Sequence, residues 1–433
     1  MRRFLRLSVA VGVLVAAGAG KVAAYSVLAH ESAIDVAWDS ALRPLLVRRF
    51  PHSSAQDLER ARSFAYGGSV IQDLGYYPFG SKFFSNLLHY CRSGDFVEAL
   101  LRDARDVDEF AFALGALAHY ANDNAGHPEA VNLSVPKIFP KLRTKFGDTV
   151  TYEQAPKQHV IVEFSFDVAQ TARGAYPLEA YRSLIGFRVA VPLLERAFLE
   201  TYGLSMSDVF PSEDRAIATY RYSVSQLIPA LTEAAWRDKR AEIEAIKPAR
   251  SRDAFVLKYS RAEFERDYGR EYQKPALFAR FLAVVYRIVP KVGPLKPLAF
   301  KAPTADTDAL FSESLRTAQA RFLSFVADVR NRRLDLRNTD FDTGQLSRHG
   351  EYALADETYA ELLERLSKRE FAGVPDGLRV NITAFYRNAP APARDSRKER
   401  QQWEHVQTAL AALGQGTGSG QRGLNSRDQG ARQ

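Results

Sequence analysis

The sequence predicts an all-α protein, in which a helical bundle is followed by a helical C-terminal extension. In most segments the apolar residues return every third or fourth position, which is the period of a helix with one buried face, and alternating strand patterns are scarce. A chain of 433 residues with 46% apolar residues is long enough for one large domain with an extension, or for two domains.

The amino-terminal segment is typical of a signal peptide. Arg2, Arg3 and Arg6 precede a run of apolar and small residues, and Ala24 stands where a signal peptidase requires a small side chain. We therefore expect an exported protein, periplasmic or secreted, cleaved after Ala24 or alternatively after Ala19. An uncleaved membrane anchor is the other interpretation, although the apolar run is shorter than the ~20 residues that span a bilayer.

The remaining elements follow in order along the chain. The front half repeats the helical period in five segments: residues 57–75, 82–104, 106–126, 158–172 and 189–203. The rear half repeats it at residues 259–272, 308–333 and 353–371. A charged stretch interrupted by Pro248 separates the two halves. The predicted organisation is a signal peptide (1–24), a helical domain (25–243), a helical extension (244–410) and a disordered tail (411–433).

Charge and cysteine content exclude some classes of protein. The formal net charge is +8, but four positive charges lie in the predicted signal peptide, and the front half after it is slightly acidic. A nucleic acid is therefore a less favoured partner for this half. The only cysteine, Cys91, cannot form an intramolecular disulfide. Stability outside the cytoplasm then depends on packing and on bound metal.

Histidines and acids recur four positions apart in two places. His119, Asp123 and His127 follow one another at this step, and His159 precedes Glu163 by the same step. On a helix such residues share one face and can bind one ion. Pairs of this kind also arise by chance, so a metal site and ordinary polar residues on helices both remain open at this point.

Gly126 and Pro128 predict where the helix that carries His119 and Asp123 ends. Gly126 is expected to end the helix, and Pro128 to favour an extended backbone at the residue before it. His127 should then lie at the C-terminal edge of the helix.

Three further residues are candidates through their surroundings. His89 lies among apolar residues of a helix, where a core histidine is the alternative interpretation. Asp73 lies in the last turn before Gly75, where the helix dipole disfavours a carboxylate unless a cation is near; an exposed aspartate is the alternative. His30 follows the predicted cleavage point closely. The clustering of histidines near acids between positions 30 and 159 favours a metal site.

The order of these residues resembles the trinuclear zinc hydrolases, the superfamily of zinc-dependent phospholipases C and single-strand nucleases. The pattern is a free amino terminus, a nearby histidine, then Asp, His, HxxxD with a further His, and HxxxE, over about Tyr25 to Gly203. The resemblance implies up to three Zn²⁺ ions in an all-α bundle. It assigns Asp73, His89, His119 and Asp123 to one ion, His127, His159 and Glu163 to a second, and His30, a bridging Asp123 and the amino group and carbonyl of Tyr25 to a third.

The resemblance also implies hydrolysis of a phosphodiester by zinc-activated water, with Asp73 as metal ligand, general base or both. Glu163 as the last ligand favours the phospholipase C branch, whereas the short step from the amino terminus to His30 is closer to the nucleases. The alternatives are a single-strand nuclease-like phosphodiesterase and a noncatalytic, metal-stabilised binding protein.

One segment of the rear half suits a phospholipid substrate. Residues 276–301 combine an apolar run with lysines, as in a segment that makes transient contact with a membrane surface. A buried helix followed by an exposed linker is the alternative.

Overall fold

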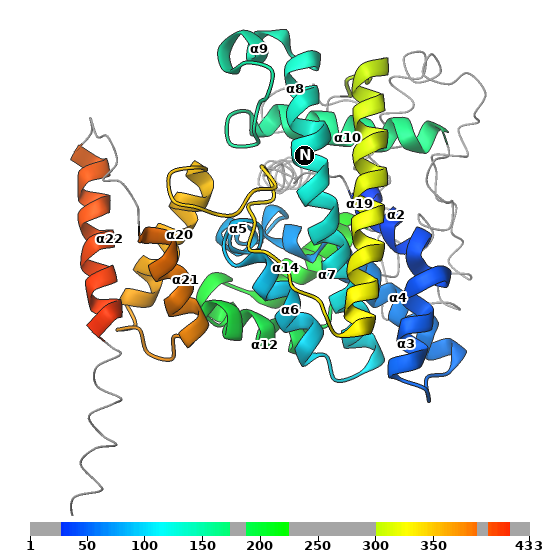
Figure 1. Cartoon of the computed structure of the whole chain (residues 1–433), viewed down its shortest axis with the longest axis horizontal. Helices are drawn as coiled ribbons and strands as arrows, with labels where there is room; N and C mark the ends of the chain where they lie inside the picture. The colour runs from blue at the N-terminus through cyan, green and yellow to red at the C-terminus, as the bar shows by residue number, and fades with distance from the viewer. Residues whose placement is uncertain (1–26, 174–187, 225–299, 388–396, 416–433) are drawn as a thin grey trace, which may run out of the picture.

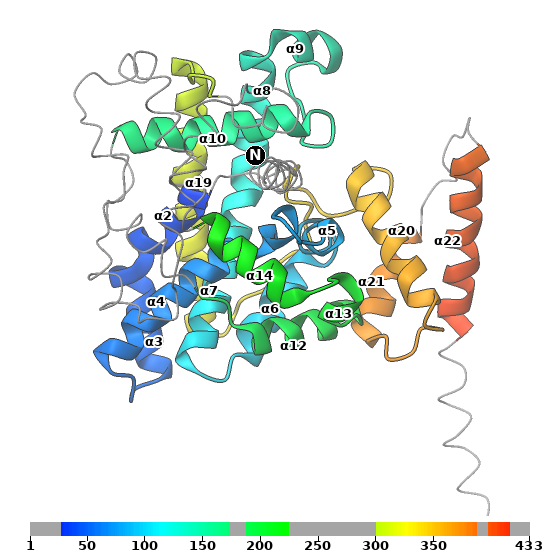
Figure 2. The same cartoon turned by 180° about the vertical axis from the view of Figure 1, so that it is seen from behind.

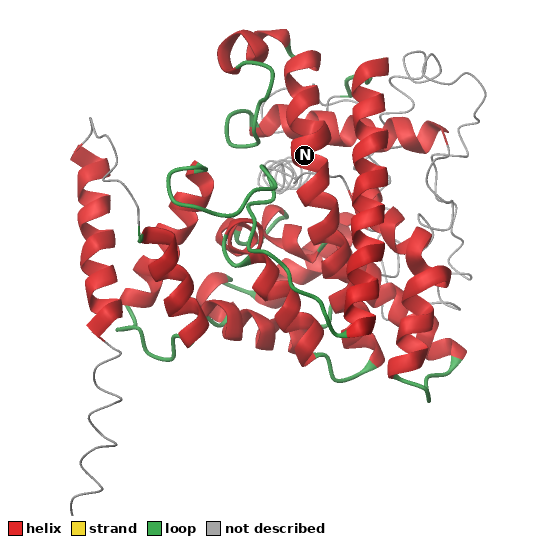
Figure 3. Ribbon diagram, viewed as in Figure 1, coloured by secondary structure: helices red, strands yellow, loops and turns green. Residues whose placement is uncertain are grey.

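The computed structural model describes residues 27–173, 188–224, 300–387 and 397–415. Every regular element in these ranges is a helix, apart from an isolated bridge between Thr339 and Leu346, which confirms the predicted all-α class (Figure 3). In chain order the helices are α2 (Val27–Ala37), η1 (Trp38–Leu42), α3 (Arg43–Arg49), α4 (Ala55–Ser69), η2 (Ile71–Tyr76), α5 (Lys82–Tyr90), α6 (Ser93–Asp103), α7 (Val107–Gly126), η3 (His127–Val131), α8 (Asn132–Ile138), α9 (Pro140–Phe146), α10 (Pro156–Arg173), α12 (Val191–Tyr202), α13 (Met206–Val209), α14 (Glu213–Tyr222), α19 (Ala305–Asn331), α20 (Ala353–Ser367), α21 (Asp376–Tyr386) and α22 (Arg397–Gln415).

Some predictions fall on residues that the structure does not describe. These are the signal peptide, Tyr25, the boundary at residues 243 and 244, and nearly all of the segment 276–301. Of the predicted tail, residues 411–415 belong to α22. Among the described helices, none is both long and apolar enough to cross a membrane.

Helix α7 is the central element of the bundle, and α4 and α19 pack along it (Figure 1). It begins after Asp106, whose side chain accepts a hydrogen bond from the backbone N–H of Glu109 and so caps the helix. Helix α4 approaches so closely that a Cβ atom added to Gly115 would lie 2.1 Å from the carbonyl oxygen of Ala65. A side chain at this position would force the two helices apart.

Two predicted helices are divided in the structure. The segment 57–75 consists of α4 and the 3-10 helix η2, and the segment 82–104 is broken at Arg92, which adopts a left-handed conformation with φ of 50°. Asp73 therefore lies in the first turn of η2, not in the last turn of a longer helix, and it is only 2% exposed. The interpretation of Asp73 as an exposed aspartate is wrong, because η2 turns back into the bundle.

The predicted extended conformation of His127 is also wrong. His127 is helical, with φ of −63° and ψ of −63°, and it opens a π-helical turn, η3, that leads directly into α8. Pro128 lies in the first turn of η3, where the missing N–H of proline has little cost. The chain thus continues as a helix past Gly126, and the wide turn keeps His127 buried.

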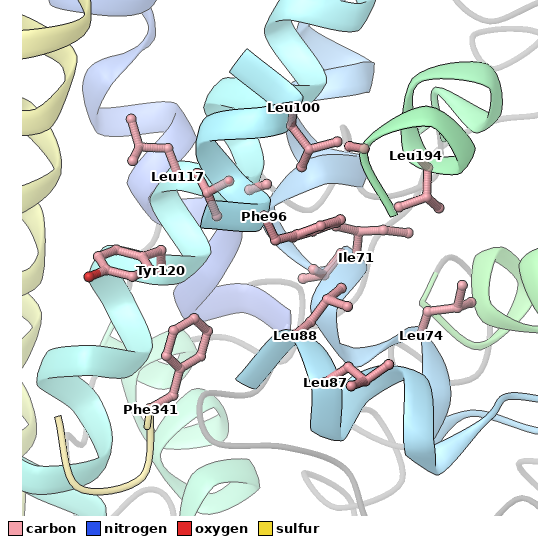
Figure 4. Close-up of a cluster of buried hydrophobic side chains, with 14 of the residues drawn as sticks. Ile71, Leu74, Leu87, Leu88, Phe96, Leu100, Leu117, Tyr120, Leu194 and Phe341 are labelled. Atoms are coloured by element: carbon pink, nitrogen blue, oxygen red, sulfur yellow. The ribbon is translucent and has the colours of Figure 1, made fainter. Parts of the chain in front are cut away.

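The rear of the chain completes the bundle. Helix α19 packs against α7, and α20 packs against α5 and α22 (Figure 2). Between α19 and α20, residues 332–352 return to the bundle, where the ring of Phe341 packs edge-on against Tyr120 of α7 at 5.4 Å between centroids (Figure 4). This return brings a segment more than two hundred residues away in sequence next to α5 and α7.

Candidate metal centre

Three groups of buried acids and histidines meet inside the bundle. Within each group the potential ligand atoms lie within 4.8 Å of one another. The groups are His30, His119 and Asp123; Asp73, His89 and His119; and His127, His159 and Glu163. His119 belongs to two groups, which therefore form one centre. The structure thus brings together eight of the nine residues singled out from the sequence, and Tyr25 lies outside the described residues.

Six helical segments supply these side chains. Helix α7 carries His119 and Asp123 one turn apart, as their spacing predicts. Helix α10 does the same for His159 and Glu163. The others are His30 of α2, Asp73 of η2, His89 of α5 and His127 of η3. Because these elements are distant in the chain, the centre exists only in the packed bundle.

Asp123 is the residue around which the first two groups gather. Its Oδ2 atom lies 3.0 Å from Nε2 of His119 and 3.4 Å from Nε2 of His89, and its Oδ1 atom lies 3.5 Å from Nε2 of His30. The same Nε2 atom of His89 also lies 3.4 Å from Oδ1 of Asp73. The two oxygens of Asp123 thus face different histidines, as a carboxylate that bridges two ions must.

The backbone orients three of the histidines through their second ring nitrogen. Nδ1 of His119 lies 3.0 Å from the carbonyl oxygen of Ser69, Nδ1 of His89 lies 2.7 Å from that of Ser85, and Nε2 of His159 lies 2.6 Å from that of Val150. A nitrogen that donates its hydrogen to a carbonyl leaves the lone pair of the other nitrogen for a metal ion, an arrangement common at metal-ligating histidines. The nitrogens left in this way are the ones that face the carboxylates.

Buried atoms without hydrogen-bond partners test whether these residues fit metal ions. Such atoms in the described part of the chain include Nε2 of His89 and of His119, Nδ1 of His159, and both carboxylate oxygens of Asp123 and Glu163. A buried polar atom left without a partner costs about 1–3 kcal/mol, and a buried charge costs more. Imidazole and carboxylate groups without thiolates suit Zn²⁺. Zinc ions among these atoms would satisfy all of them, so the residues fit.

Burial and neighbouring charges shift the pKa values of the side chains in the centre. Burial alone would raise the pKa of Asp123, but His119, His30 and His89 together lower it well below its ordinary value. Burial would lower the pKa of His89, but Asp123 and Asp73 raise it to about 10. Burial raises the pKa of Glu163 well above its ordinary value, and the charges of Asp123 and Asp73 add to this.

One further carboxylate at the centre was not found from the sequence. Asp342, in the segment between α19 and α20, is 1% exposed, and its Oδ1 atom lies 3.0 Å from Nδ1 of His127. It stands in the stretch "NTDFDTG", which has neither a histidine nor helical spacing to mark it. Only the packing of this segment on the bundle reveals it.

Comparison with known proteins agrees with this geometry. Residues 31–211 match the family model described as zinc dependent phospholipase C, and this range contains every residue of the three groups except His30. No curated protein and no solved structure matches the chain. The match confirms the resemblance predicted from the sequence and zinc as the cofactor. Residues 31–211, which carry all of the grouped residues except His30, are thus similar to the zinc-dependent phospholipase C family.

Proposed function

We propose that this protein is an exported hydrolase that uses zinc to cleave a phosphodiester, with a phospholipid as substrate, as a phospholipase C does. The observation that carries the proposal is the meeting of three buried ligand groups within one centre, in the region that matches the zinc-dependent phospholipase C family. A noncatalytic role for the metal is the alternative, and the experiment below separates the two.

Zinc, when bound, supplies Lewis-acid activation of water and of a phosphoryl oxygen. The residues of the chain would hold the ions and accept the proton of the attacking water. Asp73 is placed for this second task, because its Oδ1 atom has no hydrogen-bond partner among the described residues and points toward His89 at 3.4 Å from Nε2. A carboxylate in this position can take the proton of the attacking water as a general base.

The environment of the cysteine also agrees with water as the attacking nucleophile. Cys91 is completely buried, and burial raises the pKa of its thiol well above the ordinary value, which disfavours this cysteine as a nucleophile. We therefore propose direct hydrolysis at phosphorus, without a covalent intermediate on the chain.

The phospholipid is preferred over a nucleic acid as the substrate. The family is named for phospholipase C, and the front half of the chain after the predicted signal peptide carries a slight acidic excess. Single-stranded nucleic acids bind basic grooves with stacking aromatic rings, which such a charge does not favour. Transient contact with a membrane surface follows from a lipid substrate and rests on residues 276–301, most of which the structure does not describe.

Export is proposed from the basic and apolar amino-terminal segment. Fractionation of cells that make the full chain tests this proposal directly. Recovery of the protein with its amino-terminal 24 residues intact in the cytoplasm would contradict it.

The catalytic proposal is tested with two substrates. The mature protein is incubated with a chromogenic phosphocholine ester and, separately, with single-stranded DNA, before zinc removal, after removal by a chelator and after zinc is restored. We expect zinc-dependent cleavage of the ester only. Cleavage of the DNA alone would favour a nuclease, and cleavage of neither substrate by the zinc-loaded protein would favour a binding protein.

A further inference from the structure

Asp342 contacts the metal centre at His127, although it lies outside the residues that match the family model, which end at residue 211. The carboxylate lies in residues 332–352, a segment held against the bundle by several hydrogen bonds, two of which lie beside Asp342. The backbone N–H of Phe341 donates to the carbonyl of His89 at 3.1 Å, and the side-chain amide of Asn132 donates to the carbonyl of Asp342 at 2.7 Å. The first hydrogen bond joins the segment to His89 of α5, and the second joins it to α8, which follows η3.

The other oxygen of Asp342 is fully occupied. Oδ2 accepts a hydrogen bond from the hydroxyl of Tyr352 at 2.6 Å and one from the backbone N–H of Tyr152 at 2.9 Å. These two donors fix the plane of the carboxylate. Oδ1 is thereby held 3.0 Å from Nδ1 of His127, in a position that does not depend on any other donor.

Asp342 and His127 make a close contact, with Oδ1 of Asp342 3.0 Å from Nδ1 of His127. Neither of these two buried atoms has a well-aligned hydrogen bond among the described residues. The same relation holds between Nε2 of His119 and Oδ2 of Asp123, at the same distance of 3.0 Å.

Two ligands of one metal ion lie close to each other in this way, without a well-aligned hydrogen bond between them. Zinc binds imidazole nitrogen and carboxylate oxygen at about 2.0–2.2 Å, so two such ligands lie roughly 3.0–3.4 Å apart when the angle at the ion is between 90° and the tetrahedral value. Each ligand then points at the ion and not at the other ligand. The pair His127 and Asp342 meets both conditions.

We propose that Asp342 is a ligand of the ion held by His127, His159 and Glu163, through Oδ1. This inference rests on the zinc centre of the proposed function. With Asp342 the donors to this ion would be two imidazoles and two carboxylates, a number and type that suit Zn²⁺, and the two negative charges would balance the charge of the ion in a buried site. The rear half of the chain thereby contributes directly to the metal centre.

Zinc binding without substrate tests this inference. The full chain is freed of metal with a chelator, and Zn²⁺ is titrated in against a competing chelator for the wild type and for Asp342→Asn, which keeps the shape of the side chain. We expect one site of the variant to bind at least about 100-fold more weakly and the others to be unchanged, since even supporting residues change metal affinity by about 10–100-fold. Unchanged affinity at every site would overturn the proposal.

A matched variant and a spectrum separate a ligand from a supporting residue. Tyr352→Phe removes one hydrogen bond to Oδ2 but keeps the carboxylate, so its affinity for zinc should fall less than that of Asp342→Asn. With Co²⁺ in place of zinc, Asp342→Asn should change the visible absorption spectrum of the bound metal, and Tyr352→Phe should not. A spectrum of Asp342→Asn identical to that of the wild type would overturn the assignment as ligand.

A crystal structure of the zinc-loaded wild type decides the question even where Asp342→Asn does not fold. The distance from Oδ1 of Asp342 to the ion should be about 2.0–2.2 Å. A distance greater than about 3 Å, with zinc on the other three residues, overturns this inference alone. A wild-type protein that binds no zinc at all overturns the proposed function as well.

Discussion

Nε2 of His30 and Nε2 of His119 face opposite oxygens of one buried carboxylate, Asp123, at 3.5 Å and 3.0 Å, and the two imidazole rings stack with their centroids 4.2 Å apart. Oδ2 of Asp123 also lies 3.4 Å from Nε2 of His89, which belongs to the second group. Asp123 thus contacts histidines of two groups, whereas Glu163 contacts His159 of its own group.

Asp123→Asn should therefore lose more zinc than Glu163→Gln. An amide oxygen is a weaker ligand than a carboxylate, and at position 123 the change affects two ions at once. We expect Asp123→Asn to retain at most one zinc per chain and Glu163→Gln to lose no more than one, measured by elemental analysis of the purified proteins. As controls, His52→Ala and His405→Ala change exposed histidines outside the groups and should keep full zinc content. Equal losses at positions 123 and 163 would contradict the bridging role.

The amino terminus created by cleavage after Ala24 should be part of the centre. The free amine of Tyr25 has an ordinary pKa near 7.7–8.0 and can release its proton to zinc, and amine and carbonyl of one residue form a five-membered chelate. Because α2 begins at Val27 and His30 is one of the grouped ligands, Tyr25 is close enough in sequence to reach the same ion.

One alanine inserted before Tyr25 tests this prediction, because it moves the amine by one residue. We expect the loss of one zinc per chain, while one alanine added after Gln433 should have no effect. Sequencing of the first residues of the exported protein establishes the cleavage point. Full zinc occupancy in the chain extended before Tyr25 would refute the role of the amine.

Gly115→Ala should destabilise the fold, because the new Cβ atom would lie 2.1 Å from the carbonyl oxygen of Ala65 and 2.7 Å from the backbone nitrogen of Ser69. Overpacking of this kind costs about 1–3 kcal/mol, or more where backbone atoms must move. Ser69 also orients His119, so zinc affinity should fall together with stability. The control is Gly414→Ala in α22, where the Cβ atom meets nothing within 4 Å and should stabilise the helix slightly. Urea denaturation measures both, and equal stabilities of the two variants would contradict the close approach of α4 and α7.

Glu213→Gln should stabilise the protein at pH 8 and have little effect at pH 5. Burial, with the nearby charges of Glu195 and Asp214, raises the pKa of Glu213 from 4.5 to about 7. The folded state thus holds the proton of Glu213 more tightly than the unfolded state. Stability is lost as pH rises from about 4.5 to about 7, and glutamine avoids that loss. Melting temperatures of both proteins across this range should diverge toward high pH; a constant difference would contradict the shifted pKa.

The spacing of residues along the sequence was sufficient to predict part of the candidate metal centre. The pairs His119 with Asp123 and His159 with Glu163 lie on single helices, where a step of four residues always returns to the same face, so the structure places them as the sequence predicts. The helical class follows from the same periodicity. The conformations of Asp73 and His127 did not follow, because a 3-10 turn and a π-helical turn have periods too close to that of an α-helix for apolar spacing to separate them.

The sequence by itself determined the helical class, the types of ligand and their order along the chain, because these depend on side-chain chemistry and on contacts within one or two turns. Only the tertiary structure decided which candidate ligands lie within reach of one another, that the two oxygens of Asp123 face different histidines, and that Asp342 contacts His127. Asp342 and His127 are 215 positions apart, and no local pattern can encode a contact that arises when residues 332–352 pack against a bundle already formed by other helices.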